Sequence, residues 1–353
     1  MKILRITTLL DFGGQEKQYI SFTEKPELLN HEYIFAAIGH GGNAEKILLE
    51  RGFEVYILDQ KVSVRNLKNI SKLYRLIKET KPDIVHTAAA EANFLGVIAA
   101  KLAGVKVIIA EEIGIPNHSS IAKKMFRYTY TFADKVIGVS NSVKEYLVSA
   151  GEIPERKGVV VYNPVSIPDR TAKIHRDYFN IIFVGRLEKV KNVEMLIRAF
   201  SQIDSQNAHL TIVGDGTEKD QLLHLTQQLN LRHKITFTGF SSSPADFLSN
   251  ADLFVLPSFS EGFGIAAVEA MMLKVPTVCS NVGGIPEFIS DSENGWLFNP
   301  HDEKKLVILL NEILSMDPGE LNDVAIKGYM SVIEKFTIEK YIQNLESLYN
   351  EFA

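Results

Sequence analysis

Two glutamates with seven residues between them lie in the stretch 257–270, which reads PSFSEGFGIAAVEA. Glu261 falls in a Ser- and Gly-rich loop after the apolar run ADLFVL, and Glu269 falls in the apolar segment that follows. This pattern predicts a strand, a loop and a helix, which together direct backbone N–H groups and the positive end of a helix to one point. Because burial of an unpaired carboxylate is costly, Glu269 should meet a cation of the chain or a polar ligand.

Two cations follow an earlier predicted strand. Arg186 stands directly after Val184-Gly185, and Lys191 opens the next predicted helix. If this strand and ADLFVL are neighbours, both cations reach the same edge as the N–H groups after Gly262. A planar guanidinium, a compact ammonium and a helix N-terminus together suit a diphosphate.

Carboxylates suit a different part of the same ligand. A vicinal diol needs a bidentate acceptor, which a carboxylate provides. This chemistry indicates a role for Glu269 on a ribose and for Glu261 on a sugar. Two further strand ends in this half carry glycine, at Gly214 in IVGDG (212–216) and at Gly239-Phe240.

The elements that must position these residues alternate between strand and helix. In the first half the apolar patterns predict strands at 2–8, 32–38, 53–58, from 84, 105–110, 135–140 and 158–162. Helices are predicted after the turn DFGGQE up to about 27, and at 43–51, 66–80, 91–103, 119–132 and 142–150, the last capped by Asn141. Such alternation is typical of a parallel sheet covered on both faces.

The second half repeats this pattern after a break. The stretch 163–177 holds two prolines and no periodicity. Beyond it, strands are predicted at 180–184, 208–213, 234–238, 252–256, 277–279 and 295–298. Helices are predicted at 190–200, 217–229, 243–249, 264–273, 286–289, 304–316, 321–335 and 338–352. We therefore expect two Rossmann-like doubly wound α/β domains that face a central cleft: 1–164 with the returning helix 338–353, a linker at 165–178, and 179–337.

Composition limits the classes of protein that remain. A chain of 353 residues with one cysteine, Cys279, predicts no disulfide framework and a reducing compartment. Residues 1–164 carry 22 Lys and Arg against 18 Asp and Glu, and the remainder 16 against 25. This asymmetry is too mild to indicate nucleic-acid binding.

Arg5 interrupts the apolar N-terminus, which favours a buried strand over a signal peptide, and no apolar run reaches the roughly 18 residues of a membrane span.

The motifs resemble those of a known family. GRLEKVKN (185–192), IVGDG and PSFSEGFGIAAVEA are similar to the retaining glycosyltransferases of family 4, which have the GT-B fold, and the paired glutamates match that family's signature. The resemblance covers most of the chain and is strongest from 180 to 287. It implies transfer of a sugar from a nucleotide donor with retention of configuration.

The resemblance also implies roles for individual residues. Arg186 and Lys191 would hold the donor diphosphate and, with Glu261, form the catalytic group. Glu261 would contact sugar hydroxyls, and Glu269 would bind the ribose. The remaining donor-binding positions would be Gly14, Gly185, Gly214, Phe240, Phe263, Gly264 and Ile265.

The acceptor side is predicted in the first domain, at Gly13, His86 and Glu112. The chain departs from the family here, because AEEIG places Glu112 where many members carry a histidine before glycine. A carboxylate at this position could recognise an amino or hydroxyl group. For His86 two interpretations remain open, a structural histidine and a substrate contact.

The segment 118–134 is basic and aromatic, with Lys123, Lys124 and Arg127 beside Phe126 and Tyr128. One interpretation is peripheral contact with an anionic membrane surface or a polyprenyl-linked acceptor. The other is a helix packed on the sheet with a solvated basic edge.

The sequence therefore predicts a cytoplasmic enzyme, with peripheral membrane contact left open. It would transfer a hexose or N-acetylhexosamine from a UDP-linked donor, in preference to a GDP-linked one, to a saccharide or lipid-linked saccharide in bacterial surface polysaccharide synthesis. We expect no cofactor and no metal, because no Asp-x-Asp motif ends a strand. A sugar-nucleotide 2-epimerase of related fold and a non-catalytic nucleotide-sugar-binding module remain as alternatives.

Overall fold

Each half of the chain is built on a parallel β-sheet. The computed structural model describes residues 1–11, 13–167 and 176–353. The chain divides into unit 1, Met1–Pro164 with Phe336–Ala353, and unit 2, Val165–Lys335. The linker predicted at 165–178 falls largely on 168–175, outside the described residues.

The unit-1 sheet has the strand order β3-β2-β1-β4-β5-β6-β7. β1 forms as predicted from the apolar N-terminus, and its Ile3, Leu4 and Ile6 are fully buried, as expected for a parallel strand covered on both faces. The strands are β1 (Lys2–Thr7), β2 (Glu32–Ala37), β3 (Glu54–Ile57), β4 (Ile84–Ala88), β5 (Val107–Glu112), β6 (Lys135–Gly138) and β7 (Gly158–Val160).

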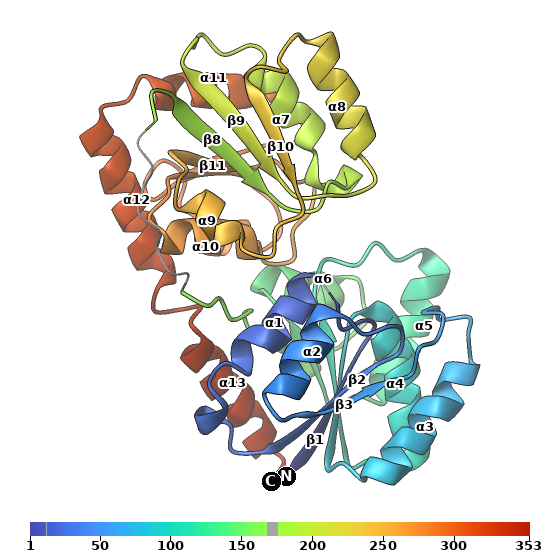
Figure 1. The fold of residues 1–353 in the computed structure, drawn as a ribbon. Helices are drawn as coiled ribbons and strands as arrows, with labels where there is room; N and C mark the ends of the chain where they lie inside the picture. The colour runs from blue at the N-terminus through green and yellow to red at the C-terminus, as the bar shows by residue number, and fades with distance from the viewer. Residues whose placement is uncertain (12, 168–175) are drawn as a thin grey trace. The chain divides into compact units, whose positions relative to one another are not determined.

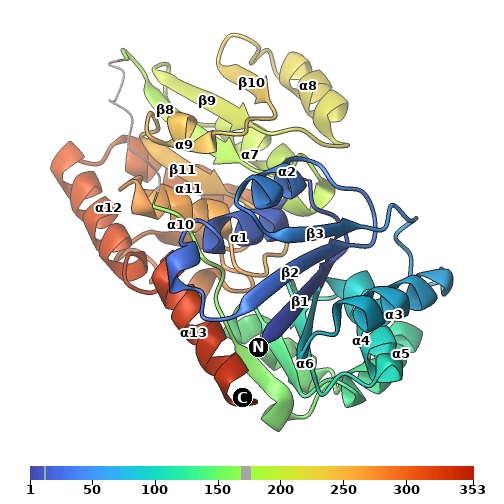
Figure 2. The same ribbon diagram turned by 60° about the horizontal axis from the view of Figure 1, so that its bottom comes forward.

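Helices cover both faces of this sheet. The helices are α1 (Gly14–Phe22), α2 (Asn43–Glu50), α3 (Lys68–Thr80), α4 (Ala90–Ala103), α5 (Ser120–Thr131), α6 (Asn141–Ser149) and α13 (Ile338–Asn350), with 3₁₀ turns at Pro26–Leu28 and Glu155–Lys157. Side chains of α1, α2 and α13 form one apolar core with the sheet, and α3, α4 and α5 lie on the opposite face (Figures 1 and 2). The two chain termini lie side by side in this unit.

The unit-2 sheet has the order β10-β9-β8-β11-β12-β13. Its strands are β8 (Phe179–Val184), β9 (Ala208–Val213), β10 (Ile235–Gly239), β11 (Leu253–Leu256), β12 (Thr277–Ser280) and β13 (Trp296–Phe298). Its helices are α7 (Val193–Phe200), α8 (Lys219–Gln228), α9 (Pro244–Leu248), α10 (Ile265–Met272), α11 (Glu303–Leu314) and α12 (Pro318–Val332), with 3₁₀ turns at Lys189–Lys191 and Ile285–Glu287. The predicted class, two Rossmann-like parallel-sheet domains, is confirmed.

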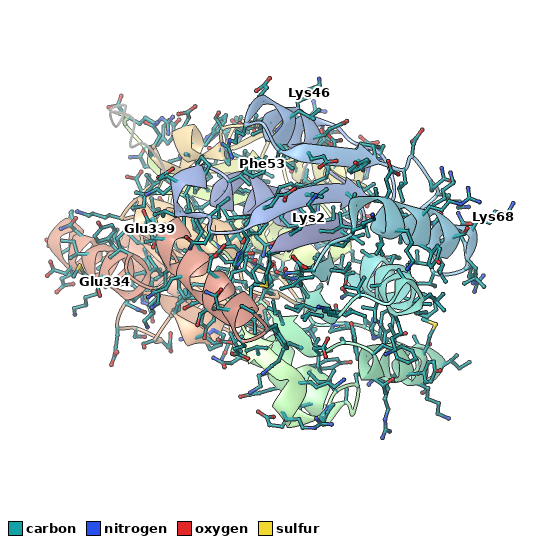
Figure 3. All side chains as sticks on the ribbon, turned by 90° about the horizontal axis from the view of Figure 1, so that it is seen from below. Lys2, Lys46, Phe53, Lys68, Glu334 and Glu339 are labelled. Atoms are coloured by element: carbon teal, nitrogen blue, oxygen red, sulfur yellow. The ribbon has the colours of Figure 1, made fainter. Side chains whose placement is uncertain are left out.

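α13 is joined to unit 1 by polar contacts as well as by its apolar face. The buried Tyr341 accepts a hydrogen bond of 3.4 Å from Arg5, and the Tyr349 hydroxyl lies 2.6 Å from His86 Nδ1. At the first turn of α13, Glu339, which Figure 3 labels, pairs with Lys25. The last helix is therefore part of the unit-1 core, although β13 and two helices of unit 2 precede it in the chain.

Several local predictions were wrong. The first helix, predicted up to about 27, ends at Phe22, and the strand predicted at 105–110 is Val107–Glu112. Ser140, not Asn141, caps α6, because its hydroxyl accepts a hydrogen bond from the Val143 N–H while the Asn141 amide donates to Tyr162. The helix predicted at 190–200 begins only at Val193, because a 3₁₀ turn occupies Lys189–Lys191. Across the residues that the structure describes, no helix has both the length and the apolar character needed to cross a bilayer.

Candidate active site

The cations and the carboxylates of unit 2 meet at the carboxyl edge of its sheet. β8 and β11 are hydrogen-bonded neighbours, with Ile181 and Ile182 opposite Leu253 and Phe254. Because the strands are parallel, the loop after β8 and the loop after β11 emerge at the same edge. The adjacency on which the predicted diphosphate site depends is confirmed.

An ion pair joins the two loops. Lys191 Nζ lies 2.6 Å from Glu261 Oε1, with the side chains 19% and 9% exposed. The same oxygen accepts a hydrogen bond of 2.7 Å from the hydroxyl of Ser258, which is fully buried. Partial burial strengthens such charge-assisted bonds, so the Glu261 carboxylate is held in one orientation. Ser258 was not among the predicted site residues, although it stands three residues before Glu261 in the sequence.

Backbone packing fixes the loop of Glu261 from the other side. Gly283, in the loop after β12, has φ +55°, and a Cβ there would lie 1.6 Å from the Glu261 carbonyl oxygen. Only glycine permits this approach. The Gly283 position is therefore a second supporting feature that the sequence argument did not identify.

α10 begins directly after this loop. Gly264 is its N-cap residue, and Ile265 starts the helix, so the first N–H groups of α10 lie at the sheet edge. Phe263 is buried and packs against Phe288 with ring centroids 5.8 Å apart. Glu269 follows Ile265 by one helical turn, lies on the same face of α10, and is 6% exposed.

Glycine contacts bring the ends of β8 and β9 together. Gly214 has φ +144°, and a Cβ there would lie 1.9 Å from the carbonyl oxygen of Gly185. Arg186 follows Gly185 and is exposed at the same edge. Phe240 follows β10, two strands further along the sheet, and is 56% exposed. Unit 2 thus brings Arg186, Lys191, Glu261 and the α10 N-terminus to neighbouring strand ends, with Phe240 at the far end of the edge.

In unit 1 the glycine turn stands at the end of β1. Gly13 is the N-cap residue of α1 and Gly14 its first residue, while the preceding Phe12 lies outside the described residues. Gln18, one turn into α1, donates a 2.6 Å hydrogen bond to Glu111 on β5 and a 3.1 Å hydrogen bond to Asn163. These contacts position the start of α1 relative to the carboxyl ends of β5 and β7.

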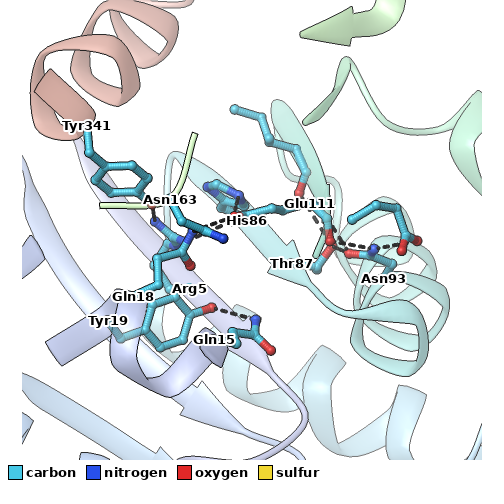
Figure 4. A network of polar contacts seen from close by, with 12 residues as sticks. Arg5, Gln15, Gln18, Tyr19, His86, Thr87, Asn93, Glu111, Asn163 and Tyr341 are labelled. Carbon is cyan, nitrogen blue, oxygen red and sulfur yellow. Dashed lines mark hydrogen bonds and ion pairs between the residues drawn. The ribbon is translucent and has the colours of Figure 1, made fainter. Parts of the chain in front are cut away.

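Glu111 is the centre of a buried polar network (Figure 4). Its carboxylate lies 3.1 Å from the Arg5 guanidinium and 3.1 Å from His86 Nε2, and all three side chains are at most 1% exposed. Burial lowers the pKa of His86 to about 4, so the ring is neutral at physiological pH. Burial alone would raise the pKa of Glu111, but the nearby His86 ring and Arg5 charge bring it below its usual range. Glu111 is therefore ionised and paired.

Glu112 points to the opposite face of the sheet. It is 3% exposed, and its Oε1 accepts hydrogen bonds from Tyr130 of α5 and Asn93 of α4. Burial raises the pKa of Glu112 to about 7, although both hydrogen bonds favour the charged form. Because His86 and Glu112 are enclosed by protein groups, their predicted acceptor role has no geometric support here and stays a prediction.

The basic and aromatic segment 118–134 separates into two faces. Phe126 and Tyr130 are buried, and His118 stacks on Phe126 with centroids 4.2 Å apart. The outer face of α5 exposes Ile121 by 82% and Tyr128 by 65%, together with the side chains of Lys124 and Arg127. The inner face of the helix is therefore packed on unit 1, and contact of the outer face with a membrane stays a prediction.

No group of three or more His, Cys, Asp or Glu side chains suited to a metal ion occurs within residues 1–11, 13–167 and 176–353.

Family models match both halves of the chain. The family model described as Glycosyltransferase Family 4 matches residues 12–167, and the model described as Glycosyl transferases group 1 matches residues 169–329. An uncharacterized glycosyltransferase of Methanocaldococcus jannaschii is 30% identical over 307 residues, which cover 80% of this chain and 78% of that protein.

Two further proteins are similar over most of their length. The Escherichia coli UDP-Gal:alpha-D-GlcNAc-diphosphoundecaprenol alpha-1,3-galactosyltransferase is 27% identical, covering 85% of this chain and 83% of its own. The crystal structure of the Anabaena protein HepE in complex with UDP and glucose superposes with a TM-score of 0.87 at 22% identity, covering 99% of this chain and 100% of that one. At 22% identity, the similarity to HepE shows a shared fold.

Proposed function

The chain belongs to glycosyltransferase family 4, and from this premise we propose that it transfers a sugar from a nucleoside-diphosphate donor with retention of configuration. The observation that carries the proposal is the Lys191–Glu261 pair of 2.6 Å at the sheet edge where α10 begins. A cation and a helix N-terminus at one edge match the diphosphate of such a donor, on which the leaving-group charge develops, and a carboxylate matches the sugar hydroxyls.

The proposed roles follow from charge and hydrogen-bonding capacity. Arg186, Lys191 and the α10 N–H groups stabilise the negative charge that develops on the leaving diphosphate. Glu261 accepts hydrogen bonds from hydroxyls of the transferred sugar, and Glu269 accepts them from the ribose diol. The C–O bond to the diphosphate breaks as the acceptor oxygen bonds to the same face of the anomeric carbon, and the acceptor proton passes to the leaving phosphate oxygen. This route requires no protein nucleophile and no metal.

For the substrates we propose a UDP-linked hexose or N-acetylhexosamine, with a GDP-linked donor second, and a saccharide or lipid-linked saccharide acceptor. The name of the Escherichia coli relative, with its UDP-linked donor and diphosphoundecaprenol-linked acceptor, supports this choice. We also propose a place in bacterial surface polysaccharide synthesis, at the inner face of the membrane. The outer face of α5, with Lys124 and Arg127 beside Ile121 and Tyr128, is the surface proposed to contact anionic lipid.

A thermal-shift panel of nucleotide sugars tests the donor class, since a ligand that binds only the folded state raises the unfolding temperature. We expect the largest shift with a UDP-linked sugar. If the panel gives no shift with any nucleotide sugar at millimolar concentration, the proposal fails. NMR of the donor incubated with the protein in the absence of an acceptor distinguishes a glycosyltransferase from a 2-epimerase. An epimerase would convert the donor sugar under these conditions, and a glycosyltransferase would not.

A further inference from the structure

The residue after Lys191 combines a left-handed backbone with a side-chain amide nitrogen that donates to two other loops. Asn192 lies in the left-handed region, with φ 52° and ψ 36°. Its Nδ2 donates hydrogen bonds of 3.1 Å to the carbonyl oxygen of Pro257 and 3.1 Å to that of Pro300. One amide group therefore joins the loops that follow β8, β11 and β13.

A second set of contacts joins the same three loops. The Phe259 N–H donates a 2.8 Å hydrogen bond to the carbonyl oxygen of Val190. The Phe259 ring stacks on His301, with centroids 5.2 Å apart and an interplanar angle of 28°. Asn192 and Phe259 thus fix these loops at two points. Lys191 lies between the fixed positions Val190 and Asn192 of its loop, and Glu261 follows the fixed Phe259 by two residues.

We propose that Asn192 is a positioning residue of the donor site, whose amide keeps the Lys191 ammonium in register with the Glu261 carboxylate. Lys191 and Glu261 belong to loops that are 70 positions apart in the chain, so their 2.6 Å separation depends on the contacts between the loops. Loss of the Asn192 amide leaves Lys191 chemically intact but frees its loop. The kinetic consequence rests on the proposed function, whereas the structural consequence does not.

The amide of asparagine meets two requirements at once. The left-handed backbone strains most side chains, and asparagine and glycine tolerate it best. The two carbonyl oxygens need two N–H donors, which glycine lacks. An aspartate would tolerate the backbone but would place a charged acceptor against both carbonyls. Asn192→Gly and Asn192→Asp therefore remove the donors and leave the backbone unstrained.

Asn230 supplies the matched control. It follows the end of α8 by two positions with φ 55°, is exposed, and lies outside the three loops. Asn230→Gly makes the same substitution in the same backbone region, so any general effect of glycine on the unfolded chain appears equally in both variants.

Hydrogen exchange by mass spectrometry decides the structural claim without any ligand. We expect peptides covering 188–192 and 257–263 to exchange at least tenfold faster in Asn192→Gly and Asn192→Asp than in the wild type, with no change in Asn230→Gly. Equal exchange in all four proteins would overturn the proposal.

Steady-state kinetics decides the functional claim. For both Asn192 variants we expect the donor kcat/KM to fall at least tenfold while the acceptor KM stays within twofold of the wild type. An equal loss for both substrates would indicate general disruption and would overturn the positioning role. If the wild type turns over no nucleotide sugar, the proposed function fails, and the exchange comparison still decides whether Asn192 joins the loops.

Discussion

Lys191 and Glu261 stand 70 positions apart in the chain, yet Nζ of the first lies 2.6 Å from Oε1 of the second. Ser258 donates to the same carboxylate oxygen, and the backbone at Gly283 packs against the Glu261 carbonyl. The pair is thus held by three separate loops at the carboxyl edge of the unit-2 sheet. Its two charges have different proposed partners, diphosphate for Lys191 and sugar hydroxyls for Glu261.

Lys191→Ala and Glu261→Ala should each abolish transfer, with a loss of at least about 100-fold in kcat/KM, because each removes a group that acts on the donor. The two variants should differ in nucleotide binding. Calorimetry should show weaker UDP binding by Lys191→Ala, and near wild-type binding by Glu261→Ala, which keeps the cations. Lys189→Ala, an exposed lysine in the same 3₁₀ turn, is the control. Wild-type turnover in either site variant would contradict these assignments.

Arg5→Leu should destabilise unit 1 by about 3–5 kcal/mol, because it leaves the ionised Glu111 buried without its main partner. The only tryptophan, Trp296, lies in unit 2 and provides an internal reference. We expect α13 amides to exchange faster in Arg5→Leu while the urea transition of Trp296 fluorescence keeps its midpoint. Arg198→Ala breaks an exposed pair with Glu194 and should change stability by less than about 1 kcal/mol. Slow α13 exchange in Arg5→Leu would refute this role.

Two tyrosines of α13 allow a matched comparison. The Tyr349 hydroxyl lies 2.6 Å from His86 Nδ1, whereas the Tyr341 hydroxyl lies 3.4 Å from Arg5 Nη1. Tyr349→Phe leaves a buried ring nitrogen unsatisfied and should cost about 1–3 kcal/mol. Tyr341→Phe should cost less stability, because the hydrogen bond between Tyr341 and Arg5 is long and Arg5 still pairs with Glu111. Urea titration followed by far-ultraviolet circular dichroism measures both, and a larger effect at Tyr341 would contradict the network.

Glu112 should make stability depend on pH near neutrality. Its folded pKa of about 7 exceeds the ordinary 4.5, so folding takes up a proton at this site in that interval. The stability that it contributes is full below pH 4.5 and is lost as pH rises through 7, a change on the order of 2–3 kcal/mol. Glu112→Gln should lose this contribution to stability. The pH dependence that His86 contributes should be the same in both proteins, so it cancels in the comparison. Parallel stability curves for the two proteins between pH 5 and 8 would show that Glu112 does not titrate there.

The outer face of α5 should bind anionic vesicles. Lys124→Glu/Arg127→Glu should lower binding to vesicles containing phosphatidylglycerol at least tenfold, since each cation near the surface contributes about 1 kcal/mol. Lys68→Glu/Lys72→Glu makes the same charge change on the exposed side of α3, whose Lys68 projects outward in Figure 3. Vesicle flotation should show binding by this control and by the wild type. Equal flotation of all three proteins would exclude α5 as the contact.

The sequence predicted the elements well because both sheets are parallel and buried. Apolar runs such as ADLFVL have few alternatives to a covered strand, and β11 forms there. Boundaries were less accurate where local hydrogen bonds decide them, as with Ser140 at the start of α6 and the 3₁₀ turn before α7.

The details of the site depended on tertiary neighbours. Hydrophobic periodicity does not give the order of strands in a sheet. The predicted approach of Lys191 to Glu261 therefore depended on the assumption that β8 and β11 are adjacent. Glu111 and Glu112 show a second limit. Successive strand residues face opposite sides of a sheet. The sequence AEEIG does not show that Glu111 faces Arg5 and His86. Nor does it show that Glu112 faces Asn93 and Tyr130 on the other side.

Product analysis of a single reaction decides whether the protein is a retaining glycosyltransferase. The wild-type protein is incubated with a UDP-linked hexose or N-acetylhexosamine and a polyprenyl-diphosphate-linked saccharide, and UDP release and the product's anomeric configuration are followed by NMR. We predict one UDP released per glycoside formed, with the donor's α-configuration kept, and neither product with Glu261→Ala. A β-linked product, or UDP-sugar that is epimerised with no glycoside formed, would contradict it.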